Sequence, residues 1–244
     1  MKKIFFTLFS IGSLFSVTAQ TTQPATTNNN WKQKALEAPG DHFMISLTSD
    51  HWSGAPDSIS SRTKGTSRGI GVALMINKPF RTDPHWSVAF GLGISNSNIF
   101  FNKTSVDLAA PGNILPFRNL DSTDNFKKYK LATTFLEVPV ELRYSLHPDR
   151  NKTWKFAIGA KVGTLLNAHT KGKTWRDKNG NTLNSYTEKV SKKAFFNGTR
   201  FVGTARVGIG NFSLVGTYQL TSLFKDGTAA DIKPFQIGIC ISGL

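Results

Sequence analysis

A run of alternating apolar and polar side chains over residues 134–146 (TFLEVPVELRYSL) constrains the fold of this chain more than any other feature. The even-numbered positions after Thr134 are apolar or aromatic, and the odd-numbered positions include Glu137, Glu141 and Arg143. Successive side chains of a strand point to opposite faces, so a period of two predicts a strand with one oily and one charged face. Whether the oily face meets a protein core or lipid depends on the rest of the chain.

The start of the chain predicts export. Lys2 and Lys3 precede an apolar run over residues 4–17, and small residues follow as far as Ala19. This pattern is typical of a secretory signal peptide, here over residues 1–19 with cleavage after Ala19. The alternative is a transmembrane anchor, which needs about 20 apolar residues, and the run is shorter than that.

The next segment, residues 20–40, is rich in Thr, Asn and Gln and has no sustained periodicity. We expect a flexible N-terminal leader there. The alternation begins after it, so the remaining residues, 41–244, are expected to form one β domain.

Seven further segments repeat the alternation and bring the predicted strands to eight. The eight segments cover residues 42–48, 68–78, 85–97, 129–146, 154–166, 195–209, 212–220 and 235–242. Long loops are expected over residues 49–67, 98–128, 169–193 and 221–233, and they alternate with short turns. An even strand count with this asymmetry is typical of outer-membrane barrels. The sequence therefore predicts an all-β fold, an eight-stranded antiparallel up-and-down transmembrane β-barrel.

Composition agrees with this prediction. The chain has 19 Phe and 21 Gly, and several glycines fall on the predicted inner face, where a narrow barrel has little room. Aromatic residues near the strand ends are expected to form interfacial girdles. They are Trp86, Phe100, Phe101, Tyr129, Tyr144, Trp154, Phe195, Phe196 and Phe235. The single cysteine, Cys240, has no partner for an internal disulfide.

Charged residues of the strands fall on the predicted inner face. They are Glu137, Glu141, Arg143, Lys155, Lys161, Arg200 and Arg206. Buried charges require partners, so we expect Glu137 and Glu141 to pair with Lys161 on the next strand and with Arg143 or Arg206. Because eight strands leave an interior that side chains fill, a salt-bridged plug is favoured over a gate or proton path. Pro139 lacks a backbone donor, and we expect a bulge there.

Catalytic residues, metal ligands and cofactors are not expected. The five histidines show neither the spacing of a zinc site nor an adjacent nucleophile. His51 with Asp50, or His169 with Ser185, could form a pair near the outer rim, but nothing in their spacing selects them.

The formal charge is +15, and the segment 169–193 carries seven cations against two acids. The cations are Lys171, Lys173, Arg176, Lys178, Lys189, Lys192 and Lys193. They are candidates for contact with lipopolysaccharide phosphates or a partner, with a solvated loop as the alternative. Nucleic acid is not expected as a partner, since no folded motif accompanies the charge.

Three segments resemble a known family: FLEVPVELRY (135–144), FAIGAKVG (156–163) and PFQIGICISGL (234–244). Together they resemble the small outer-membrane β-barrel proteins of Bacteroidetes-type bacteria, grouped as PorT-like or outer membrane protein β-barrel domain proteins. The resemblance implies an OmpA/OmpX-like architecture, and PorT itself is associated with type IX secretion. The chain departs from the pattern of other outer-membrane proteins by ending in Leu244, which bears on assembly rather than on the fold.

We therefore expect a monomeric, non-enzymatic protein of the bacterial outer membrane with a side-chain-filled lumen. Its outer loops would serve surface interaction, envelope integrity or secretion assistance, with outer-membrane lipid and envelope or secretion-machinery proteins as partners. The alternatives are a narrow channel for ions or small solutes, an outer-membrane lipid A-modifying enzyme, and a soluble periplasmic barrel that binds an apolar ligand.

Overall fold

The computed structural model describes residues 43–150 and 152–243. The predicted signal peptide and leader lie outside the described residues.

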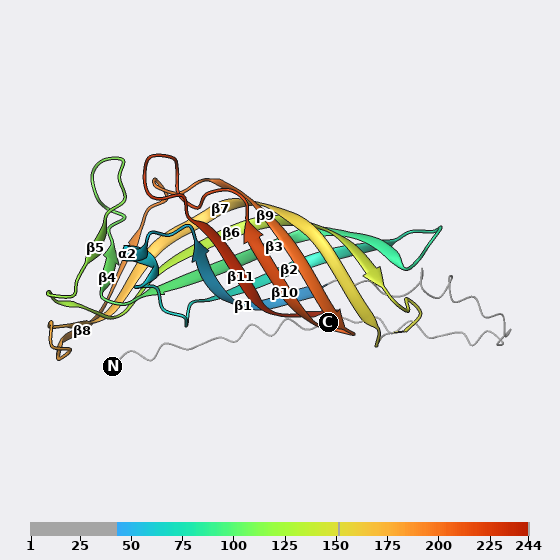
Figure 1. Cartoon of the computed structure of the whole chain (residues 1–244), viewed down its shortest axis with the longest axis horizontal. Coiled ribbons are helices and arrows are strands. Elements are labelled where there is room, and N and C mark those ends of the chain that lie inside the picture. Colours follow the sequence, from blue (N-terminus) through green and yellow to red (C-terminus); the bar gives the residue numbers. More distant parts are fainter. Residues whose placement is uncertain (1–42, 151, 244) are drawn as a thin grey trace, which may run out of the picture. The chain divides into compact units, whose positions relative to one another are not determined.

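Eight long strands form a closed antiparallel barrel (Figure 1). They are β1 (Phe43–Ser53), β2 (Arg68–Pro79), β3 (Trp86–Phe101), β6 (Asn125–Ser145), β7 (Trp154–Arg176), β9 (Thr199–Ile209), β10 (Phe212–Gln219) and β11 (Lys233–Ser242). Each of them pairs with the next barrel strand along the chain, and β1 pairs with β11 to close the ring. The predicted eight-stranded up-and-down barrel is therefore confirmed.

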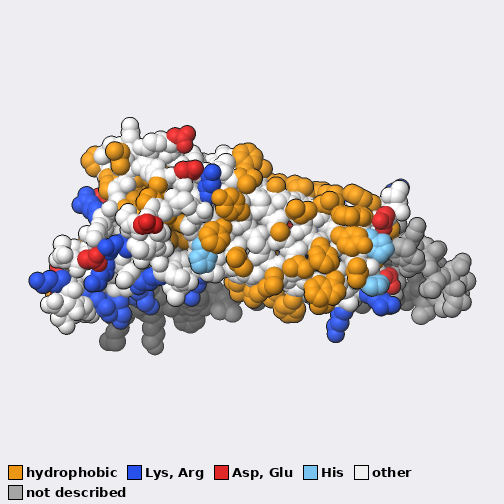
Figure 2. All heavy atoms as spheres, in the orientation of Figure 1, with side chains coloured by type: hydrophobic (Ala, Val, Ile, Leu, Met, Phe, Trp, Pro, Cys, Tyr) orange, Lys and Arg blue, Asp and Glu red, His pale blue; other side chains and the backbone are white. Residues whose placement is uncertain are grey.

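The outward face of the barrel is apolar, and the inward face holds the charges. On β6, Val138 and Val140 are 49% and 48% exposed, whereas Glu137 and Glu141 are each 4% exposed. A soluble sheet would bury the apolar face and expose the charged one. The exposed apolar side chains form a belt around the barrel strands, visible in orange in Figure 2. This apolar belt includes Leu47, Ile70, Leu92, Ile94, Val138, Val140, Ile158, Val162, Leu166, Leu214 and Ile239.

The long connections at one end of the barrel fold into a cap. The helical turn α2 (Asp57–Ser60) follows β1, and the strands β4 (Thr104–Val106) and β5 (Phe117–Asn119) pair with each other between β3 and β6. No helix among the described residues is long and apolar enough to cross a membrane. The cap has a hydrophobic core of its own, which we call the cap core. It comprises Ile59, Ile99, Phe101, Val106, Leu108, Leu115, Tyr129, Leu131, Phe135, Leu165, Ala168, Phe195, Phe196, Leu223, Phe224 and Ile232.

The segment 169–193, predicted as a loop, is mostly strand. β7 continues to Arg176, and β8 (Thr182–Ser191) pairs with its extension to form a hairpin. The prediction failed because the hairpin lies beyond the apolar belt. There both faces carry polar side chains, so the alternation that marks a lipid-facing strand is lost.

Four of the predicted girdle aromatics are in the cap core instead. Phe195 and Phe196 are 2% and 1% exposed and precede β9, which begins at Thr199 rather than near residue 195. Phe101 and Tyr129 are buried with them. Aromatic residues near a strand end suit either a membrane interface or a packed core, and the sequence alone does not distinguish the two.

The bulge expected at Pro139 lies elsewhere. The register between β6 and β7 shifts between Thr134 and Phe135, whereas Pro139 pairs in register with Lys161. The β3–β6 ladder skips two residues on each strand, between Phe90 opposite Val140 and Gly93 opposite Glu137. The missing N–H of Pro139 is thus accommodated by a gap in the ladder.

Gly238, on the inner face of β11, tests how tightly the barrel is closed. A Cβ added to Gly238 would collide with the backbone oxygen of Leu47 on β1, while a Cβ on Gly216, which is on the outward face of β10 opposite Ile237, would meet nothing within 4 Å. We expect Gly238→Val to lower the free energy of unfolding by about 1–3 kcal/mol, the usual cost of overpacking. Gly216→Val is the matched control. The measurement is the temperature at which the folded form is lost in detergent, and equal temperatures for the two variants would contradict the close approach.

Candidate functional site

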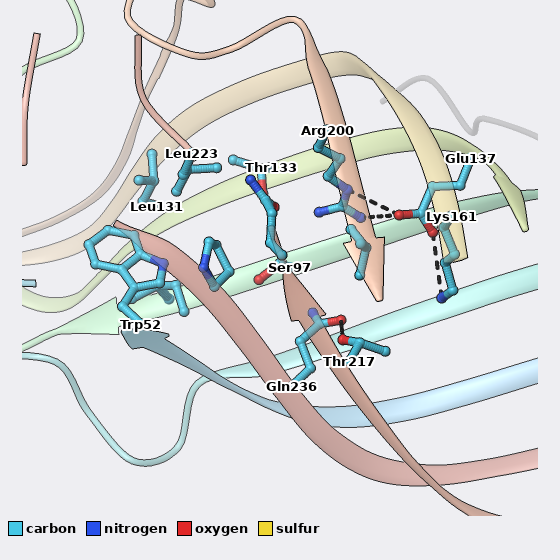
Figure 3. Close-up of a pocket in the computed structure, with 14 residues that line it drawn as sticks. Trp52, Ser97, Leu131, Thr133, Glu137, Lys161, Arg200, Thr217, Leu223 and Gln236 are labelled. Atoms are coloured by element: carbon cyan, nitrogen blue, oxygen red, sulfur yellow. Dashed lines mark hydrogen bonds and ion pairs between the residues drawn. The ribbon is translucent and has the colours of Figure 1, made fainter. Parts of the chain in front are cut away.

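Glu137 is the centre of one buried ion-pair cluster in the lumen (Figure 3). The Arg200 Nε donates to Glu137 Oε1 at 3.0 Å, and the Arg200 Nη2 donates to the same oxygen and to Ser95 Oγ, the latter at 2.6 Å. The Lys161 Nζ lies 3.7 Å from Glu137 Oε2. The Arg200 guanidinium also lies over the ring of Phe135, with Cζ 3.8 Å from the centroid. Both oxygens of the carboxylate therefore face a cation.

Glu141 is the centre of a second cluster. Its Oε2 accepts from Arg143 Nε and from Arg206 Nη2, each at 2.9 Å. The Arg206 Nη1 also donates to Ser242 Oγ on β11 at 3.3 Å. The side chains of Glu141, Arg143 and Arg206 are all less than a tenth exposed. The two clusters place two carboxylates among four cations, Lys161, Arg143, Arg200 and Arg206.

The structure brings Lys161 to Glu137, and Arg143 and Arg206 to Glu141. The sequence predicts Arg200 inside the barrel but does not predict its contact with Glu137. This contact spans three strands, because Gly163 on β7 lies opposite Glu137 on one side and opposite Arg200 on the other. With no side chain at Gly163, the two ions meet across it. The sequence feature that corresponds to this contact is the last glycine of FAIGAKVG, Gly163. Its position between Glu137 and Arg200 is known only when the registers of β6, β7 and β9 are known.

The space beside the Glu137 cluster is small. A cavity of about 20 Å³ lies beside the Glu137 cluster, lined also by Trp52, Ser97, Thr217 and Gln236 (Figure 3). That volume accommodates about one water molecule. Ion pairs therefore fill this part of the interior, as expected for a barrel of eight strands.

Aromatic side chains pack at the transition from lumen to cap. The ring of Trp52, at the end of β1, lies edge-on to Phe101, Phe117 and Phe224, at centroid distances of 5.5, 6.5 and 6.0 Å. These rings come from β1, β3, β5 and the connection between β10 and β11. The cap connections are thus tied to the barrel and to one another by apolar contacts.

The seven cations of the segment 169–193 do not form one patch. Lys171 and Lys173 lie exposed on β7, and Lys189 on β8 is directly opposite Lys171. Arg176 and Lys178 lie at the far end of the hairpin, and Lys192 and Lys193 follow β8. The Lys192 Nζ lies 5.7 Å from the centroid of the Phe195 ring.

Neither histidine pair considered from the sequence is assembled. The Asp50 side chain is buried and accepts hydrogen bonds from Thr48 and Ser97, whereas the ring of His51 stacks on Phe235. Neighbouring residues of a strand face opposite ways, which separates the two side chains. His169 is opposite Ser191 in the ladder, not Ser185. In residues 43–150 and 152–243 there is no group of three metal-ligating side chains.

One hydroxyl–imidazole contact was missed. Ser49 Oγ lies 3.0 Å from His51 Nε2, two residues along β1. Both side chains are on the outward face, next to the end of the apolar belt. Among the described residues no carboxylate bonds to the other ring nitrogen, so the pair lacks the orienting group of a catalytic triad.

The match to a family model agrees with the geometry. Residues 8–225 match a family model described as outer membrane protein beta-barrel domain. Two similar solved structures are of Ail, the attachment invasion locus protein of Yersinia pestis, one of them in complex with the heparin analogue sucrose octasulfate. They are 13% and 12% identical to this chain, and each alignment covers 82% of this chain and 94% of the Ail chain with a TM-score of 0.34. No curated protein matches the sequence.

The ion pairs of the lumen should be coupled energetically. Arg200→Met leaves Glu137 with only the more distant Lys161, and we expect a loss of about 3–5 kcal/mol in the free energy of unfolding. The double variant Arg200→Met/Glu137→Met should recover part of that loss, because no unpaired buried carboxylate remains although Lys161 then lacks its partner. Urea unfolding of the refolded barrel in lipid vesicles measures both. Additive losses in the double variant would contradict the pairing.

Proposed function

The chain belongs to the outer membrane protein beta-barrel domain family, and from this membership we propose that it is a non-enzymatic protein that acts through its cap at the cell surface. The family implies an outer-membrane location, and barrels of this kind carry their longer loops on the outer side. The observation that supports a surface role is the cap core, which packs the long connections together.

A packed cap is suited to recognition because its surface is preorganised. Flexible loops would lose conformational entropy on binding, whereas connections already packed around Phe101, Phe196 and Phe224 lose less. The cap also presents apolar side chains to solvent. Ile114, Leu183 and Tyr186 are 73%, 56% and 41% exposed, the last two on the β7–β8 hairpin. Surface contact with another protein is the role that these features favour.

Two more specific roles fit a surface contact, namely maintenance of envelope integrity and assistance to secretion. The resemblance of FLEVPVELRY to PorT-like proteins motivates the second of these. In both cases the partner would be an envelope or secretion-machinery protein that contacts the cap.

The contact can be mapped in intact cells. A photo-crosslinking amino acid at Leu183 or Tyr186 is expected to give an adduct with a second protein. The same group at Phe212, at the opposite end of the barrel, is the control. Absence of adducts at both hairpin positions, or equal adducts at all three positions, would contradict a role for the hairpin.

The filled lumen opposes the rival function of a narrow channel. With about 20 Å³ free beside Glu137 and the cap core above it, we expect no steady conductance from the purified protein in planar bilayers. Reproducible single-channel steps under the same conditions would favour the channel.

The contact between Ser49 and His51 is the observation that would favour a lipid A-modifying enzyme. The proposal predicts that overexpression leaves the mass spectrum of lipid A unchanged. A new lipid A species that disappears with Ser49→Ala would overturn it.

A further inference from the structure

The outward face of β3, β6, β7 and β8 changes character just past the apolar belt. At the edge of the apolar belt this face carries Ile94 and Leu166, which are 51% and 45% exposed. The next outward positions on these strands are Asn96, Thr134 and Asn167, which lie on one rung of the sheet. The surface thus passes from hydrocarbon-like to hydrogen-bonding side chains within two residues.

Asn96 and Thr134 are linked to each other and, through Asn98, to a lysine. The Lys130 Nζ donates to Asn98 Oδ1 at 2.6 Å, and Asn98 Nδ2 donates to Asn96 Oδ1 at 2.6 Å. Asn96 Nδ2 in turn donates to Thr134 Oγ1 at 2.8 Å. This chain of hydrogen bonds holds the amides and the Lys130 ammonium in a fixed arrangement on the outer surface.

Farther from the belt, lysines face one another across the strands. Lys130 on β6 is opposite Lys171 on β7, and Lys171 is opposite Lys189 on β8. Lys128 is opposite Lys173 on the following outward rung. We call these five residues the lysine face. Figure 2 shows Lys and Arg side chains gathered beyond the apolar belt, at the end of the barrel that carries β8.

An aromatic ring and a further cation extend the lysine face along its edge. Phe100 on β3 is opposite Lys130, and the Lys130 Nζ lies 5.7 Å from the centroid of its ring. The Arg68 Cζ lies 5.8 Å from the same centroid. The cations therefore continue from β8 to β2.

Like charges directly opposite in a sheet repel, so this arrangement opposes folding unless an anion is present. None of the five lysines forms an ion pair with an acidic side chain of the described residues. Glu188 and Lys189 are neighbours on β8, so their side chains are on opposite faces of the strand. Glu188 shares its face with Val190, which packs against the cap core. The described chain thus supplies no carboxylate to compensate the lysine face, which leaves this face open to an anion from outside.

Two pKa shifts outside the membrane-spanning part agree with this crowding of positive charge. Burial and the neighbouring cations Lys171 and Arg68 lower the pKa of Lys130. Burial and the lysines at 189, 130 and 171 lower the pKa of His169, which lies between the belt and the lysine face.

We propose that the lysine face binds the phosphate groups of lipopolysaccharide in the outer leaflet. The order along the surface is apolar belt, amide and hydroxyl side chains, then ammonium groups. In that lipid the acyl chains are joined through amide and ester groups to sugars that also carry the phosphates. The apolar belt, the hydrogen-bonding side chains and the ammonium groups therefore offer a partner to each of these parts. The inference needs only the outer-membrane location and does not depend on the proposed surface contact.

The height of the lysine face fits a headgroup. Lys130 is six residues from Leu136, about 20 Å along the strand and about 14 Å along the membrane normal at the usual tilt of about 45°. Lysine side chains can extend back toward the boundary and shorten that distance. The polar interface extends about 5–8 Å beyond the hydrocarbon on each side, so a lysine side chain that extends back toward the boundary brings its ammonium group to the outer edge of that interface.

The lysine face occupies one side of the barrel. At the same end, the outward side chains of β9, of β11 and of the residue that follows β10 include Phe201, Phe235 and Leu220. Lys233 on β11 pairs with Asp231 at 3.4 Å. A localised lipid site is therefore a better description than a ring of positive charge.

The test compares two triple variants of the full chain. K130Q/K171Q/K189Q removes three charges from the lysine face, and K127Q/K178Q/K225Q removes three from exposed positions elsewhere. The probes are lipid nanodiscs that contain purified lipopolysaccharide, the same lipid after phosphatase treatment, or phosphatidylglycerol. Each lysine near an anionic surface adds roughly 1 kcal/mol, so we expect the first variant to bind lipopolysaccharide at least about tenfold more weakly. The second variant and the dephosphorylated lipid supply the two controls.

Stability gives an independent readout. In detergent without lipopolysaccharide, K130Q/K171Q/K189Q should unfold at a temperature equal to or higher than that of the parent, because the repulsion is gone. Added lipopolysaccharide should raise the unfolding temperature of the parent and of K127Q/K178Q/K225Q but not of the lysine-face variant.

Four results would overturn the proposal. They are equal lipopolysaccharide binding by both triple variants, equal binding of the dephosphorylated lipid, equal binding to phosphatidylglycerol, and full competition by millimolar inorganic phosphate. The last two would identify a general anion surface rather than a lipopolysaccharide site.

Discussion

The structure depends on the pairing of carboxylates with guanidinium and ammonium groups inside the barrel. A membrane strand must present apolar side chains outward, which leaves its polar residues to the interior. In so narrow a lumen an unpaired charge would be strongly destabilising. Arg200 and Lys161 compensate Glu137, and Arg143 and Arg206 compensate Glu141. Gly163 makes the first of these clusters possible, because Arg200 reaches Glu137 across it.

The barrel and the cap are held together by different interactions. Ion pairs occupy the lumen around Glu137 and Glu141, and under the proposed function they provide support rather than passage. The cap core, with Trp52 packed against Phe101 and Phe224, gives the long connections a fixed form. The proposed contacts with other molecules use the cap and the outward face of the strands, where the lysine face lies next to the apolar belt.

The fold could be predicted from the sequence because lipid on one side imposes a strict period of two on every membrane strand. The inward position of Glu137, Glu141 and Arg206 follows from the same period. The bond between Arg200 and Glu137 could not be predicted, because it depends on the register of three strands. The hairpin formed by β7 and β8 was missed for a different reason. Beyond the belt, a residue such as Lys171 meets water whichever face it occupies, so the lysine face emerges only when β6, β7 and β8 are aligned.

The central claim is that the apolar face meets hydrocarbon while the charges are enclosed, and spin labelling tests it most directly. With Cys240 replaced by Ser, a nitroxide at Val138 or Val140 would be compared with one at Ile114 in the cap. In reconstituted vesicles we predict relaxation of the β6 labels by oxygen, which dissolves in lipid, and of the cap label by a water-soluble nickel chelate. Relaxation of the Val138 and Val140 labels by the nickel chelate would contradict the account.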